Sequence, residues 1–596
     1  MSTVAVMDST MNPAMEVSLK GYILCHTTMT ENLYQCFVSL DELYGDPNAM
    51  IRSSIFQARN RDYLLGLHGK TESILREWIN MLYWFPAARE SELNFGTFLR
   101  QAHDHGILQT HDHIFRFIRL CTEMCVNLFS RELCPQFFSC INVRRKCNFI
   151  WNAYVHLLAQ LVKHSGGVVD KINLLNKVLG IVAGVLLRDL EVMQTTFKQV
   201  PYHKIFFGLF LELNAAEPIL KNINLEVLTT FCNLLQILNP NNAPGFVNAW
   251  LDIVTHTSFL GSMLRHTSEQ KIWGMYAQLI IDLFKFLSPF LRTGCLEDST
   301  RMLHKTTQVM LLVLLRDFPE FLCDHQYTFC DAMSPYCIEM RNLILTPFPR
   351  NIPLTNPYTP DLKVDMLPEI SRPPRRNTSY ANMIQSAHFK KDLDSYLGSG
   401  SPATFLSKLI RNLKSNELDS PFSYNIPLIN ALVLYVGTQA IDCINSKGLK
   451  PSMSTIKDSK QTKFSEDLVS QLDTMGCYLF LTAICNQLTY PNSHTHYFSC
   501  LLQCLFNSAV KEDIHIQITK VVLERMAVNR IYPWGLLITA IELAKNPIFR
   551  LLGHDYVWAP EIEILFNYVA QLEEQESNQR ITHEPESADS HEERKG

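Results

Sequence analysis

The densest group of side chains that could bind a metal ion lies between residues 103 and 113. It contains four histidines and two aspartates, namely His103, Asp104, His105, His111, Asp112 and His113. Imidazole and carboxylate groups are common zinc ligands, and a zinc ion with an open coordination position can activate water for hydrolysis. The two His-x-His pairs flank Gly106, however, and lack the His-Glu-x-x-His spacing that places two ligands on one helix face. We therefore favour a polar connection between two helices, with a metal-dependent hydrolase as the alternative.

Two other groups of reactive residue types are better explained by structure than by chemistry. Cys121 and Cys125 are four residues apart, so they share one face of a helix, and no second cysteine pair at zinc-ligand spacing lies nearby. We expect both thiols to pack in the core. His494 and His496 follow the segment YPNS, which predicts a turn and the start of a helix. Helix capping and surface contact are favoured there over catalysis.

A basic group surrounds a proline-rich segment in the second half of the chain. Its members are Arg372, Arg375, Arg376, Lys390 and Lys391. These cations could contact phosphates, but no aromatic residues alternate with them to stack on bases. A solvated linker is the favoured interpretation, and a direct RNA-binding solenoid is the alternative.

Motifs typical of enzymes are missing from the sequence. It has no glycine-rich phosphate loop, no nucleophile elbow and no pair of carboxylates at helical spacing that stands out. We therefore predict a protein that is not an enzyme and that needs no cofactor.

The elements that position these residues are best seen between residues 521 and 566, which read as a helix, a tight turn, a second helix, a break and a third helix. Pro533 suits a helix start, and Trp534, Leu537 and Ile538 follow at helical spacing until Asn546 and the next proline end the pattern. Neither helix can bury its apolar face alone, so such units must pack as pairs against neighbouring pairs. The same unit recurs along the chain. The sequence predicts an all-α fold, a HEAT-like solenoid of helical hairpins.

The pattern of apolar residues and breakers divides the rest of the chain. Residues 46–62 are predicted to be a loop, 346–374 an extended proline-rich segment that forms a hinge or a strap, 445–463 a flexible loop and 573–596 a charged disordered tail. Helices are predicted at 31–43, 71–85, 95–101, 112–128, 148–164, 171–187, 202–213, 224–238, from 246, and at 268–291, 300–316, 323–329, 336–345, 389–397, 402–413, 426–444, 464–488, 496–508, 513–528 and 561–572.

Composition favours a soluble protein inside the cell. The chain has 596 residues, 47% of them hydrophobic, and a formal net charge of -5, which gives no general attraction to nucleic acid. The 17 cysteines lie mostly at core-like positions, the first residues lack the pattern of a signal peptide, and the longest apolar runs are too short to cross a membrane. We expect reduced thiols and no membrane partner.

Several segments resemble one known family, the scaffold (NOT-one) subunit of the CCR-NOT deadenylase complex, in its C-terminal region. The resemblance runs from about residue 47 to about residue 571. It is carried by LCTEMCV at 120–126, LVKHS at 161–165, KINLLNKVLG at 171–180, APGFV at 243–247, MYAQL at 275–279, DFPEFLCD at 317–324, LKVDML at 362–367, FKKDLDSYL at 389–397, INALVLYVGTQA at 429–440, YPNSHTHYFSC at 490–500 and PWGLLIT at 533–539.

The resemblance implies a domain organisation and a function. It implies a divergent segment at 1–46, a connector-like helical domain at 47–190, the family's homology domain of HEAT-like repeats at 198–572, and the tail. In the family that domain docks the NOT-two and NOT-three subunits and RNA-binding repressor adaptors of the Nanos type. The expected role is a scaffold in mRNA deadenylation, mRNA decay, RNA-mediated gene silencing, translational repression and transcription regulation, in the cytoplasm, including P-bodies, and in the nucleus. Because the family's upstream regions are missing from the sequence, any link to catalysis or to RNA is expected to be indirect.

Candidate contact residues cluster at the turns of the last repeats. We predict partner contacts at Tyr490, Asn492, His494, His496, Arg530 and Trp534. Trp534 also suits a core position, so this residue has two open interpretations. The segments 371–387 and 445–463, the run His111 to His113 and the acidic tail differ from the family's pattern.

Overall fold

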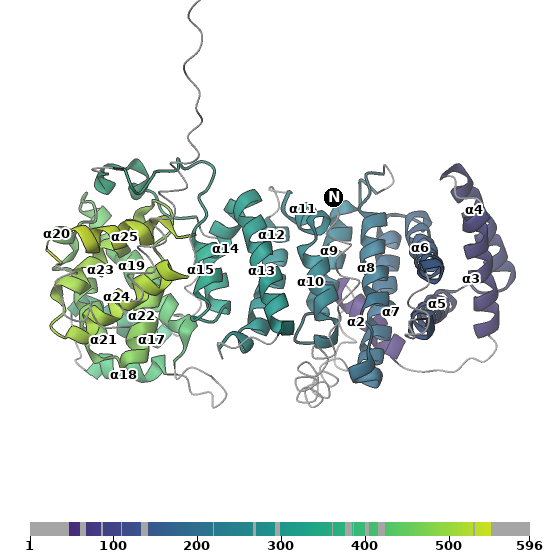
Figure 1. Ribbon diagram of the computed structural model, residues 1–596, viewed down its shortest axis with the longest axis horizontal. Coiled ribbons are helices and arrows are strands. Elements are labelled where there is room, and N and C mark those ends of the chain that lie inside the picture. Colours follow the sequence, from purple (N-terminus) through teal and green to yellow (C-terminus); the bar gives the residue numbers. More distant parts are fainter. Residues whose placement is uncertain are drawn as a thin grey trace, which may run out of the picture. The chain divides into compact units, whose positions relative to one another are not determined.

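A computed structural model shows the protein as a succession of α-helices (Figure 1). The structure describes residues 47–59, 67–84, 88–108, 110–132, 141–217, 220–265, 270–292, 298–359, 362–375, 384, 387–399, 404–414, 424–528, 531–546 and 548–549. Within these residues the only β-type pairing is one isolated bridge between Lys414 and Tyr424. The all-α prediction is confirmed. The predicted helices 31–43 and 561–572, and the predicted tail, lie outside the described residues.

The chain forms two compact units, Met1–Thr307 and Gln308–Gly596. The division falls within helix α13 (Asp298–Asp317). It also lies inside the predicted domain 198–572, and the predicted domain boundaries stay predictions.

The helices of the N-terminal unit follow one another with short connections. They are α2 (Pro47–Arg59), α3 (Leu67–Trp84), α4 (Ala88–Asp104), α5 (His111–Glu132), α6 (Ile141–His164), α7 (Val168–Met193), α8 (Val200–Leu213), α9 (Asn224–Ile237), α10 (Val247–Thr255), α11 (Thr257–Arg265) and α12 (Gln270–Leu287), with short 3-10 helices η1 (Gln194–Thr196), η2 (Pro244–Phe246) and η3 (Phe290–Arg292).

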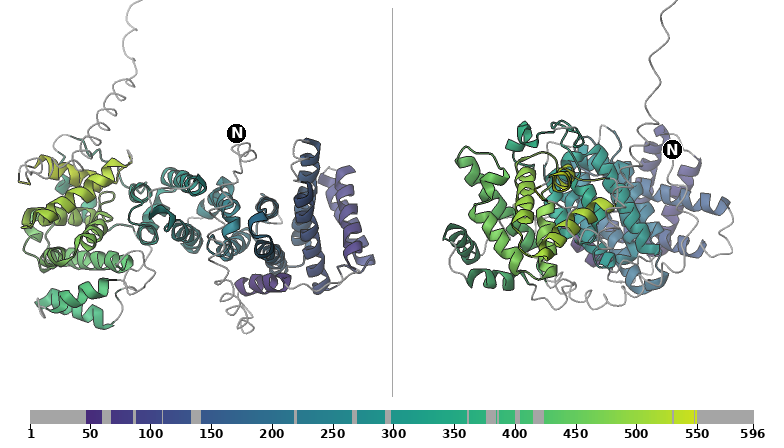
Figure 2. Two further views of the ribbon diagram at one scale, coloured as in Figure 1. Left: turned by 60° about the horizontal axis from the view of Figure 1, so that its bottom comes forward. Right: turned by 60° about the vertical axis from the view of Figure 1, so that its left-hand side comes forward.

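Aromatic side chains fill the contact between α3, α4 and α6. Trp78 of α3 is fully buried, its ring lies edge-on to Phe98 of α4 with 5.4 Å between ring centroids, and its Nε1–H donates to the carbonyl oxygen of Ala153 in α6 at 2.8 Å. The indole thus combines a large buried apolar area with a satisfied polar atom. Figure 2 shows α3 and α4 side by side from another viewing direction.

The predicted loop at 46–62 is wrong, because most of it forms helix α2. This helix packs against α7 at close backbone distance near two glycines of α7. A Cβ atom added to Gly180 would lie 2.7 Å from the carbonyl oxygen of Ile51, and one added to Gly184 would lie 2.6 Å from that of Ile55. The two glycines, one helical turn apart, let α2 bury its few apolar residues. The contact is tertiary, and local sequence preference gives little sign of it.

The C-terminal unit contains a second set of helices. They are α14 (Pro319–Ala332), α15 (Ile338–Leu345), α17 (Ala387–Ser399), α18 (Thr404–Leu413), α19 (Ile426–Ser446), α20 (Met453–Ile456), α21 (Lys460–Gln471), α22 (Thr474–Cys485), α23 (Ser493–Ser508), α24 (Glu512–Ala527) and α25 (Trp534–Lys545). One continuous apolar cluster joins α17 to α25 around α19, α22 and α23.

Two sequence predictions in this unit need correction. The predicted helix 464–488 is two helices, because Asp473 interrupts it and caps α22 by accepting the N–H of Gly476 at 2.8 Å. The predicted flexible loop 445–463 is partly helical, since Ser452 caps α20 and Ser459 caps α21. In both places a short polar side chain starts a helix that the apolar pattern alone does not show.

The segment between α15 and α17 confirms the predicted strap as far as it is described. Residues 346–359 and 362–375 contain no α-helix and include two short 3-10 helices, η4 (Val364–Met366) and η5 (Pro368–Ser371). The segment packs on α23 and on the start of α25 within the same unit. Residues 346–375, where described, are called the strap below.

Helix α19 is the one described helix that is long and apolar enough to cross a membrane. In its most apolar window, 56% of the residues are buried inside the protein. Burial of this extent is what a central core helix shows.

Candidate partner-binding region

Five of the six predicted contact residues come together where the strap meets the turn between α22 and α23. The structure buries all five, with exposed fractions of 1% for Tyr490, 1% for Asn492, 3% for His494, 5% for His496 and 4% for Trp534. Arg530 lies outside the described residues. The five side chains therefore have an internal role in this conformation, and their contact with a partner stays a prediction.

Asn492 organises the turn. Its Oδ1 accepts the N–H groups of His494 and Thr495 at 2.9 and 3.0 Å, and its Nδ2 donates to the carbonyl oxygen of Tyr490 at 2.6 Å. The first two bonds satisfy donors that a helix start otherwise leaves unpaired. The predicted helix start is confirmed, with Asn492 as its N-cap. The surface contact predicted for His494 and His496 is wrong, because both side chains are buried.

The strap is held on this turn by hydrogen bonds to aromatic side chains and backbone. The hydroxyl of Tyr490 accepts the N–H of Arg375 at 2.8 Å, and the N–H of Ser493 donates to the carbonyl oxygen of Arg372 at 2.8 Å. The Nε1–H of Trp534 donates to the carbonyl oxygen of Thr355 at 2.9 Å. Both aromatic residues thus bury their rings and use their polar ends to hold a segment distant in sequence.

Gly535 lies where the start of α25 approaches the turn between α22 and α23. The N–H of Gly535 donates to the carbonyl oxygen of Thr489 at 2.7 Å, and a Cβ atom on Gly535 would lie 2.3 Å from the side chain of Thr495. The sequence Pro-Trp-Gly therefore starts α25, anchors the strap and lets the helix approach the turn closely.

His496 is buried beside the strap and keeps an unusual environment. Its Nε2 lies 2.7 Å from the carbonyl oxygen of Pro451 and 3.3 Å from Oδ1 of Asp365. Burial lowers the pKa of His496, although the Pro451 carbonyl and the Asp365 carboxylate act in the opposite direction. A neutral ring that donates its Nε2–H to Pro451 fits this geometry.

The predicted basic group is not a set of free cations. Arg375 forms a two-point ion pair with Asp324, with Nε–Oδ1 and Nη2–Oδ2 distances of 2.8 and 3.0 Å, and this pair raises its pKa. The Nζ of Lys390 lies 5.8 Å from the centroid of the Tyr435 ring. Arg372 and Lys391 are exposed, and Arg376 lies outside the described residues. Phosphate contact by this group stays a prediction. The ion pair between Arg375 and Asp324 counts against it.

The histidines and cysteines of the N-terminal unit occupy structural positions. His103 and Asp104 end α4, Gly106 takes a left-handed φ of 74° in the connection, and Asp112 pairs with Arg116 at 2.8 Å. Among the described residues, no group of three or more histidine, cysteine, aspartate or glutamate side chains is placed to hold a metal ion. Cys121 and Cys125 are fully buried, as predicted, and burial raises the pKa of Cys125 to about 12.

Two buried arginines, which the sequence reasoning missed, join α15 and α24 to the helices around them. Nη2 of Arg525 donates to Oδ1 of Asn486 at 2.7 Å, and Nη2 of Arg341 donates to the carbonyl oxygens of Met333 and Ser334 at 3.2 Å each. Burial lowers the pKa of Arg525, and the nearby charge of Arg341 adds to this effect. The sequence contains a sign of the burial of Arg525, because this residue follows Val521 by four positions and so lies on the buried face of its helix.

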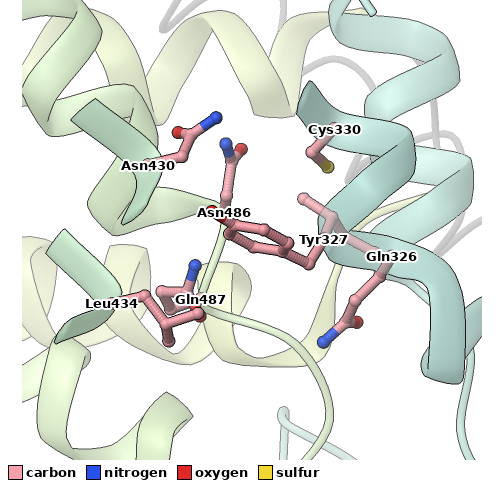
Figure 3. A pocket seen from close by; sticks show the side chains of 8 residues that line it. Gln326, Tyr327, Cys330, Asn430, Leu434, Asn486 and Gln487 are labelled. Carbon is pink, nitrogen blue, oxygen red and sulfur yellow. The ribbon is translucent and has the colours of Figure 1, made fainter. Parts of the chain in front are cut away.

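A small pocket is lined in part by Asn486 and Cys330 (Figure 3). Arg525 donates to the Asn486 side chain and Arg341 to the Cys330 carbonyl oxygen. The space open to the centre of a water molecule is about 10 Å³, enough for about one water. Beside it Asn430 donates to Asp331 at 2.6 Å, and burial raises the pKa of Asp331 to about 7. The polar side chains around this pocket can form hydrogen bonds between helices. The lining residues are Gln326, Tyr327, Cys330, Leu345, Asn430, Leu434, Asn486 and Gln487.

Comparison with known proteins identifies the family. The family model described as "CCR4-Not complex component, Not1" matches residues 210–570. The "CCR4-NOT transcription complex subunit let-711" of Caenorhabditis elegans is 39% identical over 517 residues, which cover 84% of this chain and 20% of that protein. The "General negative regulator of transcription subunit 1" of Schizosaccharomyces pombe is 29% identical over 80% of this chain and 22% of its own length. The chain thus spans about a fifth of these relatives.

Solved structures agree with the sequence comparison. The NOT1 superfamily homology domain from Chaetomium thermophilum matches with a TM-score of 0.74 at 24% identity, covering 85% of this chain and 99% of that domain. A Not1 C-terminal domain, solved in complex with Not4, matches with a TM-score of 0.71 at 25% identity, covering 84% of this chain and 99% of that one. The predicted helical-repeat fold and the resemblance are confirmed, and the chain belongs to the family of the CCR4-Not complex component Not1.

Proposed function

We propose that this chain is a non-enzymatic scaffold of a CCR4-NOT-type complex. The observation that carries the proposal is the family match over residues 210–570, together with a structural relative that was solved in complex with Not4. On this proposal the helical units bind subunits of the NOT-two, NOT-three and Not4 types and repressor adaptors of the Nanos type. The chain would then act in mRNA deadenylation and translational repression, in the cytoplasm and the nucleus.

The strap supports this proposal physically. It is a segment of irregular backbone that lies on helices and is held through backbone groups and two aromatic side chains. A helical surface that binds one extended segment in this way can bind others, because each added helix pair extends the surface without a single dominant contact. Extended partner segments are therefore the class of ligand that suits the fold best.

Co-purification tests the proposal. The full chain is expressed with the C-terminal regions of NOT-two-type and NOT-three-type subunits, treated with ribonuclease and separated by size. We expect one stable complex with all three proteins in equal amounts. If the chain is helical and melts cooperatively but elutes alone, and also fails to bind a Not4-type subunit, the scaffold proposal is wrong for this chain.

A further inference from the structure

An exposed aromatic cluster lies at the junction of α3 and α6 in the N-terminal unit. Tyr83 and Trp84 are 65% and 72% exposed. The Tyr83 ring lies edge-on to the rings of Trp84 and Phe149, with centroid distances of 5.4 and 5.7 Å. We call these three residues the aromatic surface.

The fold does not account for this exposure. Trp78, on the same helix, is fully buried and donates its Nε1–H to a backbone oxygen. Among the tryptophans that the structure describes, Trp84 alone is exposed, because Trp78, Trp151, Trp250, Trp273 and Trp534 are each at most 9% exposed. A group of large aromatic rings that are exposed to solvent at one place on the surface is typical of a binding surface.

Two cations lie on the helix face that carries Phe149. Arg145 and Lys146 precede Phe149 on α6 by four and three residues, so all three side chains share one helix face. Both are exposed, and neither has an ion-pair partner among the described residues.

We propose that the aromatic surface, with Arg145 and Lys146, binds single-stranded RNA. Cations placed to meet phosphates next to rings on which bases can stack are the two components of sequence-tolerant single-strand binding. In the basic group of the C-terminal unit, by contrast, Arg375 is occupied by Asp324. The site is independent of the scaffold proposal, because it lies outside residues 210–570.

Titration of the full chain with fluorescent oligouridylate of about ten nucleotides tests the proposal. Trp84→Ala is expected to weaken binding about tenfold, whereas Trp84→Phe keeps a stacking ring and most of the affinity. In Arg145→Glu/Lys146→Glu, the slope of log affinity against log salt is expected to fall by about 1.4, the value for two phosphate contacts on a single strand. RNA should also quench tryptophan fluorescence in the wild type and less in Trp84→Ala.

A matched control separates a local site from general charge. Lys198→Glu/Lys221→Glu changes the net charge of the same unit equally at two other exposed lysines. It is expected to change RNA affinity by no more than about twofold, because salt screens distant surface charges. An equal loss of affinity in both double variants would overturn the proposal. So would unchanged RNA affinity in Trp84→Ala combined with tight binding of polyglutamate, which would indicate an acidic protein ligand instead.

Discussion

The aromatic surface of α3 and α6 and the strap contact of α22 to α25 use the same two residue types in opposite ways. Tyr83 and Trp84 are 65% and 72% exposed, whereas Tyr490 and Trp534 are 1% and 4% exposed. The hydroxyl of Tyr490 and the Nε1–H of Trp534 each pair with the strap backbone. A tyrosine or tryptophan therefore becomes structural when a distant backbone group reaches its polar end, and residue type alone does not decide between the two roles.

The largest expected difference between the two regions is the effect of removing the indole. Trp534→Ala should lower the free energy of unfolding by about 3 to 5 kcal/mol, since it leaves a cavity and releases Thr355. Trp84→Ala should change it by less than about 0.5 kcal/mol, as at an ordinary surface position. Urea unfolding followed by circular dichroism measures both. Equal losses would contradict the distinction between the regions.

The next largest loss of stability is expected when the helix cap Asn492 at the strap contact is removed. Asn492→Ala removes two accepted hydrogen bonds and leaves the buried carbonyl oxygen of Tyr490 without this donor. We expect a loss of about 1 to 3 kcal/mol. The control is Asn80→Ala on α3, an exposed helix position three residues before Tyr83, where alanine should be neutral or slightly stabilising. A neutral Asn492→Ala would mean that the turn is held by other contacts.

Removal of single hydroxyl groups compares the two tyrosines directly. Tyr490→Phe leaves the ring in place and breaks only the bond from the N–H of Arg375, so about 0.5 to 1.5 kcal/mol should be lost. Tyr83→Phe should cost nothing measurable. Hydrogen exchange of the Arg375 amide is a sharper readout, because it should accelerate in Tyr490→Phe and stay unchanged in Tyr83→Phe.

Acid should loosen the strap contact through His496. Its pKa is lowered in the folded protein, so the unfolded chain binds the proton more tightly, and stability is lost as the pH falls below the ordinary histidine pKa of about 6.5. The slope is limited to about 1.4 kcal/mol per pH unit for one proton. His496→Gln should be less sensitive to pH between about 6.5 and 5 than the wild type. If the wild type and His496→Gln lose stability equally as the pH falls, His496 does not have this role.

Much of this region could be predicted from local sequence. The segment YPNS was identified as a turn before a helix start, and Pro533 as a helix start, because both residue patterns have a known local function. The burial of Tyr490 and Trp534 could not be predicted, since it depends on a strap more than a hundred residues earlier. The sequence indicated exposed turns in this region, but in the structure the backbone of the strap covers them.

The N-terminal unit shows the same limit at α2. Its residues were predicted to be a loop, and only the glycines of α7 make room for the helix. Gly180 and Gly184 were visible in the sequence as two glycines four apart in an apolar helix. Their partner was not, because nothing in α7 specifies which distant segment fills the space.

Helix α2 also has a consequence for the order in which the protein folds. It is synthesised before α3 to α6, yet its packing surface does not exist until α7 has been made. Until then α2 has no tertiary stabilisation, and short helices without it are marginal in water. Docking of α2 is thus a late step in assembly. By the same logic α2 should detach first during partial unfolding, exposing Gly180 and Gly184 while the rest of the unit remains folded.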